Sequence, residues 1–231
     1  MTRSDFLRGA VRAVAALPLV LAAGCGGARD GDEAVPAAAL VRAAARGDVA
    51  EVRRLLAAGA GVDERTADGR TAVTAAALGD HVDVARLLVD AHADVDLQDA
   101  DRNNALLVCG ETGSVAMLRE VLRAKPDLTA TNRFGGTALI PASDRGHVAM
   151  VRALLRTRID VDHVNDLGWT ALLEAVILGE GGPPHQQIVR ALVDAGADVN
   201  LGDRASVTPL AHARERGYAE IARTLEAAGA R

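Results

Sequence analysis

Aromatic residues and cysteines are scarce in this chain of 231 residues. Phe, Trp and Tyr together make up 2% of the sequence, and the two cysteines are Cys25 and Cys109. So few rings exclude an ordinary core built on aromatic anchors, although 49% of the residues are hydrophobic. Two distant cysteines exclude a disulfide scaffold and a cysteine-rich zinc site. The core must therefore be built mainly from alanine, valine and leucine.

The patterns that usually carry chemistry are also missing. The net charge of −5 gives no basis for binding nucleic acid. None of the six histidines forms an i, i+4 pair on one helix, and no glycine-rich phosphate loop occurs. The acidic run at 94–101 lacks the glycine and glutamate spacing of a calcium loop. We therefore expect no metal, no cofactor and no catalytic residue, and we interpret the chain as a non-enzyme.

What the chain does have is an internal period of about 33 residues. Similar three-residue anchors begin at Thr71, Asn104, Thr137, Thr170 and Thr208. The first four anchors are evenly spaced, and the last follows after a longer interval because residues 181–184 form an insertion. Such a period indicates a stack of small supersecondary units rather than a single globular core.

Each unit has the pattern of two short helices. In the second unit, the apolar residues from Val82 to Val89 give a helix with one broad apolar face. The preceding stretch, Ala72 to Leu78, is almost entirely apolar, so it can be a helix only if neighbouring helices cover both of its sides. One unit alone buries too little surface, and stability must come from stacking.

The residues around the anchors resemble ankyrin repeats. The resemblance is carried by Asp68-Gly69-Arg70-Thr71-Ala72-Val73, by Gly146-His147 and by Ala195-Gly196-Ala197-Asp198-Val199-Asn200. Six such units cover about Ala37 to Arg231, which implies an all-α solenoid of six helix-turn-helix units with hairpin-like connections and the end units as caps. The third unit departs most, with Arg102 and Lys125 in place of glycine and Asn104 in place of threonine.

The amino terminus has the plan of a bacterial signal peptide. Arg3, Arg8 and Arg12 precede an uncharged apolar run, Ala13 to Ala23. That run is shorter than the roughly 20 residues of a membrane-spanning helix. It ends in Leu-Ala-Ala-Gly before Cys25, which resembles a lipobox and implies acylation of that cysteine. An ordinary secretory signal with an incidental Cys25 is the alternative.

This pattern divides the chain into three parts. Residues 1–24 are predicted to be the signal peptide, 25–36 the lipidated amino terminus and a flexible linker, and 37–231 the repeat domain. The expected location is extracytoplasmic, on the cell membrane or the outer membrane, either periplasmic or at the cell surface.

The resemblance also implies where a partner would bind. Ankyrin repeats contact partners through their concave side, with the hairpin tips and the exposed ends of the first helices. Those offsets give Asp101, Glu111, Arg133, Phe134, Asp144, Arg145, Asp166, Leu167, Trp169, Ile177 and Leu178. Aromatic anchors beside arginine are typical of binding hot spots. Alternatively, Ile177 and Leu178 pack under the insertion and Trp169 merely covers them.

Several smaller expectations concern the fold. Cys109 stands where other units have alanine, so we interpret it as a buried, inert residue. His81 and His147 occupy equivalent positions at the entry to a second helix, whereas His185 is expected in a loop. The helix-ending position, usually a left-handed glycine, is occupied by His92, Lys125 and Arg158 in units two to four. We therefore expect the centre to be the least stable part.

Taken together, the sequence predicts a monomeric, lipid-anchored module that binds a protein partner at the outer face of a bacterial membrane. A narrower version is an immunity or inhibitor protein for a secreted toxin. An envelope enzyme, or a protein that binds a metal or a small molecule, is the alternative of a different class. A structural spacer without a defined partner is the third possibility.

Overall fold

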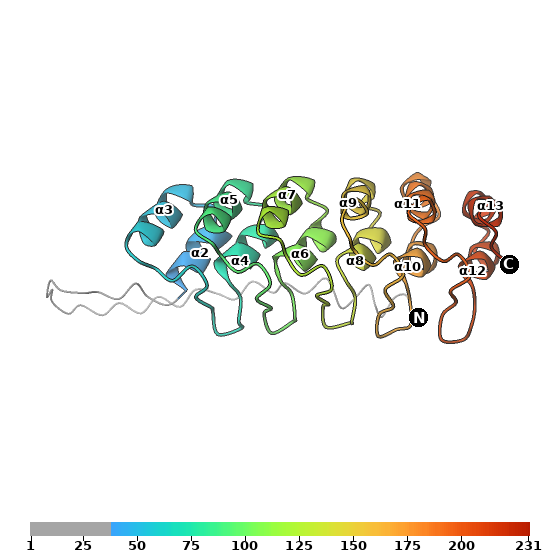
Figure 1. Cartoon of the computed structure of the whole chain (residues 1–231), viewed down its shortest axis with the longest axis horizontal. Coiled ribbons are helices and arrows are strands. Elements are labelled where there is room, and N and C mark those ends of the chain that lie inside the picture. Colours follow the sequence, from blue (N-terminus) through green and yellow to red (C-terminus); the bar gives the residue numbers. More distant parts are fainter. Residues whose placement is uncertain (1–37) are drawn as a thin grey trace, which may run out of the picture. The chain divides into compact units, whose positions relative to one another are not determined.

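The computed structural model describes residues 38–231, and in this part of the chain it contains twelve helices and no strand. The predicted signal peptide, Cys25 and the linker lie outside these residues. The helices form six consecutive pairs, which are the six repeats (Figure 1). The first helices are α2 (Ala39–Ala45), α4 (Ala72–Leu78), α6 (Ala105–Thr112), α8 (Leu139–Asp144), α10 (Ala171–Ile177) and α12 (Pro209–Glu215). The second helices are α3 (Val49–Ala57), α5 (Val82–Asp90), α7 (Val115–Arg123), α9 (Val148–Leu154), α11 (Pro183–Asp194) and α13 (Ala219–Ala227).

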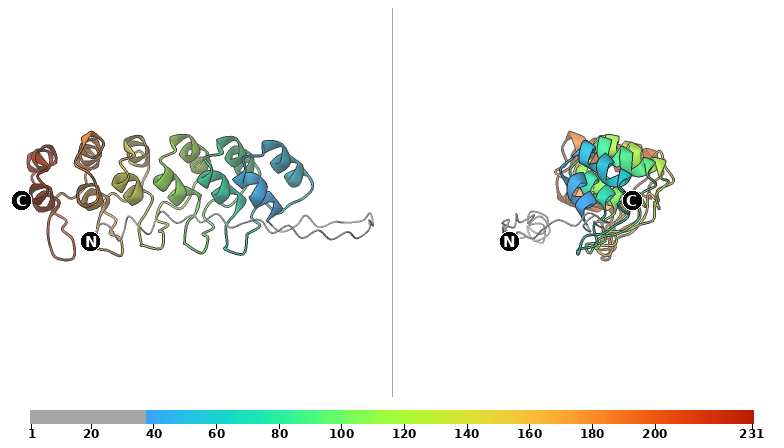
Figure 2. Two further views of the ribbon diagram at one scale, coloured as in Figure 1. Left: turned by 180° about the vertical axis from the view of Figure 1, so that it is seen from behind. Right: turned by 90° about the vertical axis from the view of Figure 1, so that its left-hand side faces the viewer.

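The two helices of a repeat lie in separate rows. Each first helix contacts the first helices of the neighbouring repeats, and the second helices do the same. The hairpin loops all project on the side of the first helices, as the views from behind and from the end also show (Figure 2). The predicted all-α stack of six units is confirmed.

The first helices are buried on almost every side. In α4, Ala72 to Ala77 are all buried, and the same holds for Ala105 to Gly110 in α6. The alanines of α4 and Ala105 and Gly110 of α6 permit the close approach of neighbouring helices. A Cβ added at Gly110 would lie 2.2 Å from the carbonyl oxygen of Ala138, so this position accepts only glycine. The prediction that these apolar stretches need cover on both sides is confirmed.

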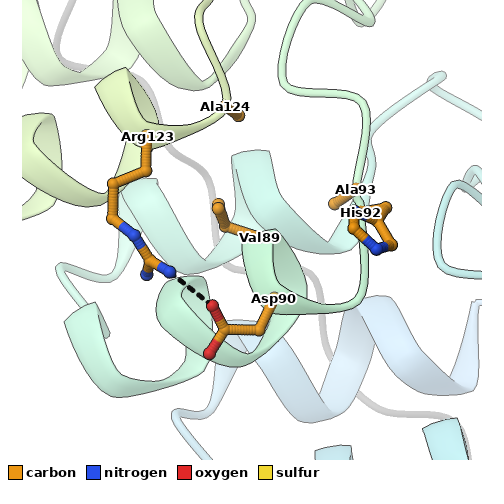
Figure 3. A pocket seen from close by; sticks show the side chains of 6 residues that line it. All are labelled: Val89, Asp90, His92, Ala93, Arg123 and Ala124. Carbon is orange, nitrogen blue, oxygen red and sulfur yellow. Dashed lines mark hydrogen bonds and ion pairs between the residues drawn. The ribbon is translucent and has the colours of Figure 1, made fainter.

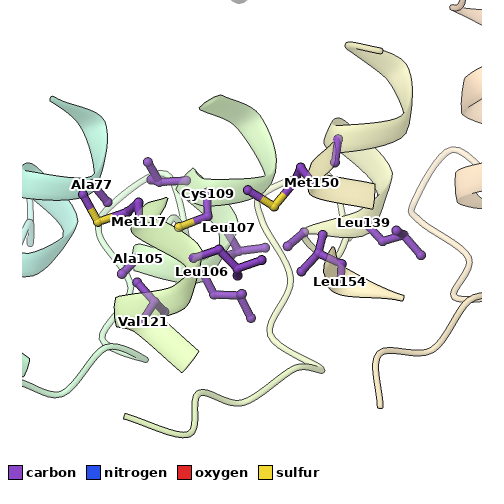
Figure 4. Packing of buried hydrophobic residues seen from close by; sticks show 14 of the residues in the cluster. Ala77, Ala105, Leu106, Leu107, Cys109, Met117, Val121, Leu139, Met150 and Leu154 are labelled. Carbon is purple, nitrogen blue, oxygen red and sulfur yellow. The ribbon is translucent and has the colours of Figure 1, made fainter. Parts of the chain in front are cut away.

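The second helices are amphipathic and close the core from one side. In α7 the buried residues are Met117, Leu118 and Val121, spaced as one helical face. The two buried methionines, Met117 and Met150, pack with leucines of the first helices in one continuous cluster (Figure 4). The core thus runs through the repeats without any aromatic residue, as the composition indicated.

Histidine side chains connect neighbouring repeats. Nε2 of His81 donates to the main-chain oxygen of Ala45 in the preceding repeat at 3.1 Å, and His147 does the same to Glu111 at 3.1 Å. A Cβ added at Gly47 would lie 2.5 Å from the His81 ring. The histidine bridge is missing between repeats two and three. Repeat three has Ser114 at the position of His81, and repeat two has Asp80 at the position of Gly47.

The insertion in repeat five lengthens both the connection before the second helix, residues 178–182, and the second helix itself. Helix α11 has 12 residues and begins with Pro183 and Pro184, which suit the first turn because they lack an N–H that would go unpaired. The prediction that His185 lies in a loop is therefore wrong. His185 is buried in α11, and its Nε2 donates to the main-chain oxygen of Asp144 at 2.9 Å. It makes the same bridge as His81 and His147.

The residue that ends the second helix is left-handed, as expected, in repeats two and three but not in repeat four. His92 and Lys125 adopt left-handed φ angles of 63° and 57°. Arg158 does not, so that prediction is wrong for repeat four. There the Thr157 hydroxyl donates to the Leu154 carbonyl at 2.6 Å and accepts the Ile159 N–H at 3.2 Å. The side chain supplies the hydrogen bonds, so no left-handed residue is needed.

Repeat three concentrates local irregularities. Arg102 and Lys125 are left-handed without being glycine. Asn104 is fully buried, and although its Oδ1 accepts the Leu107 N–H at 2.9 Å, its Nδ2 has no hydrogen-bond partner. A buried polar group without a partner costs about 1–3 kcal/mol. These features add to the missing histidine bridge at the same place.

Candidate partner-binding surface

Five hairpin turns of the same geometry present residues at their tips. In each turn the first and fifth residues pair through the main chain, for example Asn132 N–H to the Gly136 oxygen at 3.0 Å. A side chain at the first position holds the tip: Asn132 Oδ1 accepts the N–H groups of Phe134 and Gly136 at 2.9 and 3.0 Å. In the four turns that begin with Asp99, Asn132, Asn165 and Asp203, this side chain accepts the N–H of the third residue and so fixes the main chain at the tip.

The chemistry of the tips changes along the stack. The third position is Asp68 in repeat two, Asp101 in repeat three, Phe134 in repeat four and Leu167 in repeat five. The side chains of Phe134 and Leu167 are 40% and 36% exposed. Adjacent tips are also joined, because the Asp166 N–H donates to the Phe134 oxygen at 2.9 Å. The hairpin tips are thus acidic in repeats two and three and apolar in repeats four and five.

Val164 also belongs to this surface, and the sequence analysis missed it. It lies just before the turn of repeat five and is 47% exposed. The signal was available, because the equivalent positions are Arg65, Gln98 and Thr131, which are all polar. Leu78, at the end of α4 in repeat two, is the other large hydrophobic residue that is strongly exposed in the described part. We define the apolar tip patch as Phe134, Val164 and Leu167.

Two ion pairs join repeats three and four, one at the hairpin tips and one at the carboxyl ends of the first helices. Arg133 pairs with Asp101 at 2.7 Å, and its guanidinium lies 4.8 Å from the centroid of the Phe134 ring. Arg145 pairs with Glu111 at 2.6 Å between the ends of α8 and α6. Both pairs join repeats three and four and are partly exposed, so each stabilises the fold little but fixes a long side chain.

The remaining predicted residues occupy more sheltered positions. Asp166 is exposed beside the Phe134 tip, whereas Trp169, Ile177 and Leu178 are half-buried. These three apolar residues do not belong to the buried core cluster or to the hydrophobic residues packed against it. Asp144 ends α8, where its main-chain oxygen accepts from His185. Of the predicted residues, Phe134 and Leu167 are therefore the apolar side chains exposed at adjacent hairpin tips, and Trp169 lies in the same hairpin as Leu167.

Helix α10 contains a buried carboxyl next to this surface. Glu174 is 6% exposed, and its Oε1 accepts from Asn165 Nδ2 at 2.9 Å. Burial, with Asp144 as a second cause, raises the pKa of Glu174 to about 8, whereas the Asn165 hydrogen bond lowers it. The equivalent pair in repeat six is His212 with Asp203, at 3.0 Å. The sequence analysis did not single out Glu174.

Other polar groups have structural explanations. Burial raises the pKa of the Cys109 thiol to about 12, as suits an unreactive core residue. In the acidic run, Asp96 accepts the Asp127 N–H at 2.9 Å, just as Asp63 accepts the Asp94 N–H at 2.8 Å. These carboxylates connect successive hairpin loops. In residues 38–231 no group of three or more His, Cys, Asp or Glu side chains is placed to hold a metal ion.

Shallow grooves lie along the row of second helices. One groove, of about 500 Å³, is lined by Val89, Asp90, His92, Ala93, Arg123 and Ala124. Asp90 and Arg123 pair across it at 2.6 Å (Figure 3). A similar groove of about 510 Å³ lies between α11 and α13. Because the groove recurs between second helices, it is a feature of the stack, and it contains none of the predicted partner-binding residues.

Comparison with known proteins decides the family. The family described as ankyrin repeats (3 copies) matches residues 40–132 and 106–203. The chain belongs to the ankyrin-repeat family. Ankyrin stacks are protein-interaction modules, which agrees with the exposed hairpin tips. No helix in residues 38–231 combines the length and the hydropathy needed to span a membrane.

Several solved ankyrin domains are similar over most of the described chain. An ankyrin repeat domain from Acinetobacter baumannii AYE is 45% identical with a TM-score of 0.81, and the match covers 84% of this chain and 99% of that one. The ankyrin repeat protein EF0377 is 37% identical with a TM-score of 0.80, over 84% and 98% of the two chains.

Two further matches are more limited. The ankyrin repeat protein YahD of Escherichia coli (strain K12) is 51% identical over 57 residues, which is 25% of this chain and only 28% of that protein. A chain in the complex of the predatory endopeptidase Bd0816 from Bdellovibrio bacteriovorus with the immunity protein Bd3460 is 22% identical, with a TM-score of 0.70 over 84% of this chain and 99% of that one. That match concerns the fold alone.

Proposed function

We propose that this ankyrin stack is a non-enzymatic module that binds one protein partner through the hairpin tips and first-helix ends of repeats three to five. The observation that carries the proposal is the apolar tip patch. Three of the four large hydrophobic residues that are strongly exposed in residues 38–231 lie on two adjacent hairpins. Exposed apolar groups lower the solubility of a free protein, so their clustering favours a binding role.

The surroundings of the patch indicate the chemistry of the partner. Asp101 and Glu111 already pair with arginines of this chain, so the rim is held before a partner arrives. The hairpin loops on both sides carry further carboxylates, including Asp166. The complementary partner surface therefore presents an apolar side chain to the patch and polar groups to the paired charges around it.

A double substitution on the patch tests the proposed site. Replacing Phe134 and Leu167 by serine removes the apolar contact, and we expect capture of the partner from envelope extract to weaken by about 2 kcal/mol, or roughly 30-fold. Leu78→Ser is the matched control, because Leu78 is 47% exposed but lies in repeat two. Bound proteins are quantified by mass spectrometry. The site lies elsewhere if Leu78→Ser weakens capture of the partner as much as the double variant does, or if the double variant leaves capture unchanged.

The proposed location rests on the amino terminus. We propose that Cys25 is acylated after removal of residues 1–24 and that the stack is held at the outer face of a membrane. Two or more acyl chains give stable anchoring, whereas one gives only marginal binding. Cys25→Ser should move the protein from the membrane fraction to the soluble fraction. Mass spectrometry of the extracted protein should find a lipid-modified first residue at Cys25, and an unmodified Cys25 would refute the assignment.

An immunity role is a narrower version of the same proposal. The solved complex with an endopeptidase pairs an immunity protein with a hydrolase, and its resemblance to this chain is one of fold. If the captured partner is a hydrolase that the stack inhibits at a one-to-one ratio, the immunity version is supported. Capture without inhibition supports a helper or positioning role instead.

A further inference from the structure

Positive charge gathers on the second helices of repeats three and four. Residues 115–125 and 148–158 contain six basic residues and one acidic residue, Glu120. At the equivalent positions, repeat two has Asp83 in the first turn of its second helix and Asp90 at the end of that helix. Repeats three and four have alanine in place of the first acid and arginine in place of the second. They therefore lack both carboxylates that offset the arginine of repeat two.

Five of the six basic residues have no acidic partner. We define the basic patch as these five exposed residues: Arg119, Lys125, Arg152, Arg156 and Arg158. In residues 38–231 none of them forms an ion pair, and Arg152 donates to the neutral Gln187 at 3.2 Å. The sixth basic residue, Arg123, pairs with Asp90 at 2.6 Å and with Glu120 at 2.7 Å.

The acids closest in sequence do not pair with the basic patch. Asp127 and Asp160 each accept a main-chain N–H of their own hairpin loop, at 2.8 and 3.0 Å. Glu120 is shared between Arg86 and Arg123. Helices α7 and α9 contact one another, so like charges are held on adjacent helices. Their mutual repulsion favours an anionic binding partner.

The basic patch offers charge without the other groups that macromolecules usually recognise. No aromatic residue occurs in α7 or α9, whereas proteins that bind single-stranded nucleic acid stack bases on aromatic rings. Protein interfaces are centred on large apolar or aromatic anchors, and the large hydrophobic residues that are strongly exposed in residues 38–231 all lie on other elements. A surface that acts through charge alone suits the headgroups of an anionic membrane.

The basic patch and the apolar tip patch lie on opposite sides of the stack. The second helices form one row, and the hairpin loops project beyond the first helices on the other side (Figure 1 and Figure 2). A membrane that contacts α7 and α9 therefore leaves Phe134 and Leu167 directed away from it.

We propose that the basic patch docks the stack on a membrane surface that contains anionic phospholipids and so presents the hairpin tips outward. The cellular setting rests on the proposed location, and the value of presenting the tips rests on the proposed partner site. Docking itself depends on neither, because vesicles of defined composition measure it directly.

Binding to vesicles of phosphatidylcholine and phosphatidylglycerol tests the docking. The patch variant carries Arg119→Gln, Arg152→Gln and Arg156→Gln. Each cation near an anionic surface strengthens binding roughly fivefold, so the patch variant should bind by about tenfold or more less tightly in a sedimentation assay. The full chain with Cys25→Ser is the background for every sample, so any contribution of the amino terminus is the same in all of them.

A matched variant controls for the loss of net charge. Arg102, Arg204 and Arg216 are also exposed and form no ion pair in the described part of the chain, but they lie in hairpins three and six and after α12. Their replacement by glutamine removes the same charge far from the patch. Because salt screens distant charges, this control should bind the vesicles within about twofold of the unsubstituted chain.

Fluorescence measures the orientation and does not depend on the glutamine variants. Trp169 is the single tryptophan of the chain and lies in a hairpin. On vesicles with a quencher attached to the headgroups, its emission should stay unquenched. Ala149 is exposed on α9 beside Arg152. A chain with Ala149→Trp and Trp169→Phe should be quenched.

The outcomes separate docking from partner binding. The proposal is overturned if the patch variant and the control bind vesicles equally well, or if Trp169 is quenched and the Ala149→Trp chain is not. It is also overturned if the patch variant loses binding to duplex DNA or to an acidic envelope protein while vesicle binding is unchanged. Partner capture in solution should survive in the patch variant, and vesicle binding should survive in the Phe134 and Leu167 double variant, so either proposal can fail alone.

Discussion

Restoring the repeat consensus in repeat three should stabilise the stack by about 2 kcal/mol. The substitutions are Arg102→Gly, Lys125→Gly and Asn104→Thr. The left-handed conformations at Arg102 and Lys125 cost about 1 kcal/mol each, which the greater freedom of glycine in the unfolded chain partly offsets. Threonine at Asn104 keeps a capping oxygen, as Thr170 shows by accepting the Leu173 N–H at 3.2 Å, and it removes the unpaired Nδ2. Urea unfolding monitored by circular dichroism measures the change.

Hydrogen exchange shows where in the stack the added stability lies, and so distinguishes repair of repeat three from a general effect of adding glycine. Hydrogen exchange of the natural protein should be fastest across Asn103 to Leu128, since the histidine bridge between repeats two and three is also missing. The triple variant should slow exchange there. Ser206→Gly is the matched control, because Ser206 has φ of 60° at the same hairpin position in repeat six. It should slow exchange only near the carboxyl end. Slower exchange in repeat three than in both flanking repeats of the natural protein would contradict the prediction.

Replacing Trp169 by alanine should weaken partner binding by about 2 kcal/mol or more, as truncation of a hot-spot residue does. Because Trp169 is half-buried and outside the core cluster, its loss should destabilise the fold less than loss of a core residue. Leu88 is fully buried in α5, and Leu88→Ala should cost about 2–5 kcal/mol of unfolding free energy. Affinity is measured with the captured partner, and stability by thermal unfolding of the same samples.

The comparison of the two variants separates binding from folding. If Trp169→Ala unfolds the protein as much as Leu88→Ala does, Trp169 is a core residue and leaves the proposed site. If Trp169→Ala changes neither stability nor binding, the partner contacts another surface, and the acidic hairpin edge at Asp99 and Asp101 is the next region to substitute.

The fold was predictable because its information is local and repeated. A regular period, with threonine at the start of most first helices and glycine at most turns, specifies the units. The nearly all-apolar stretch from Ala72 to Leu78 indicated by itself that helices must cover it on both sides. Equivalent positions then placed Phe134 and Leu167 at hairpin tips, and the structure has both exposed there.

The errors arose where an insertion or a neighbouring side chain changed the hydrogen bonds of a repeat. His185 looked like a loop residue because the insertion hid its equivalence to His147. Only the packed structure extends α11 and places the ring on the preceding repeat. Arg158 was expected to be left-handed, but the Thr157 hydroxyl ends the helix in another way. Neither outcome follows from the repeat pattern, since both depend on which donor reaches which acceptor.

The sequence by itself determined the architecture, the number of repeats and the positions that face outward, because each unit encodes its own turns and apolar faces. Only the tertiary structure decided which side chains meet across repeats. Glu174 shows the difference, because one glutamate among apolar residues carries no special signal in the sequence. Stacking buries it and brings it near Asp144 of the preceding repeat, and this burial raises the pKa of Glu174 to about 8. Burial and charge at that site are properties of three neighbouring repeats, so no single repeat could reveal them.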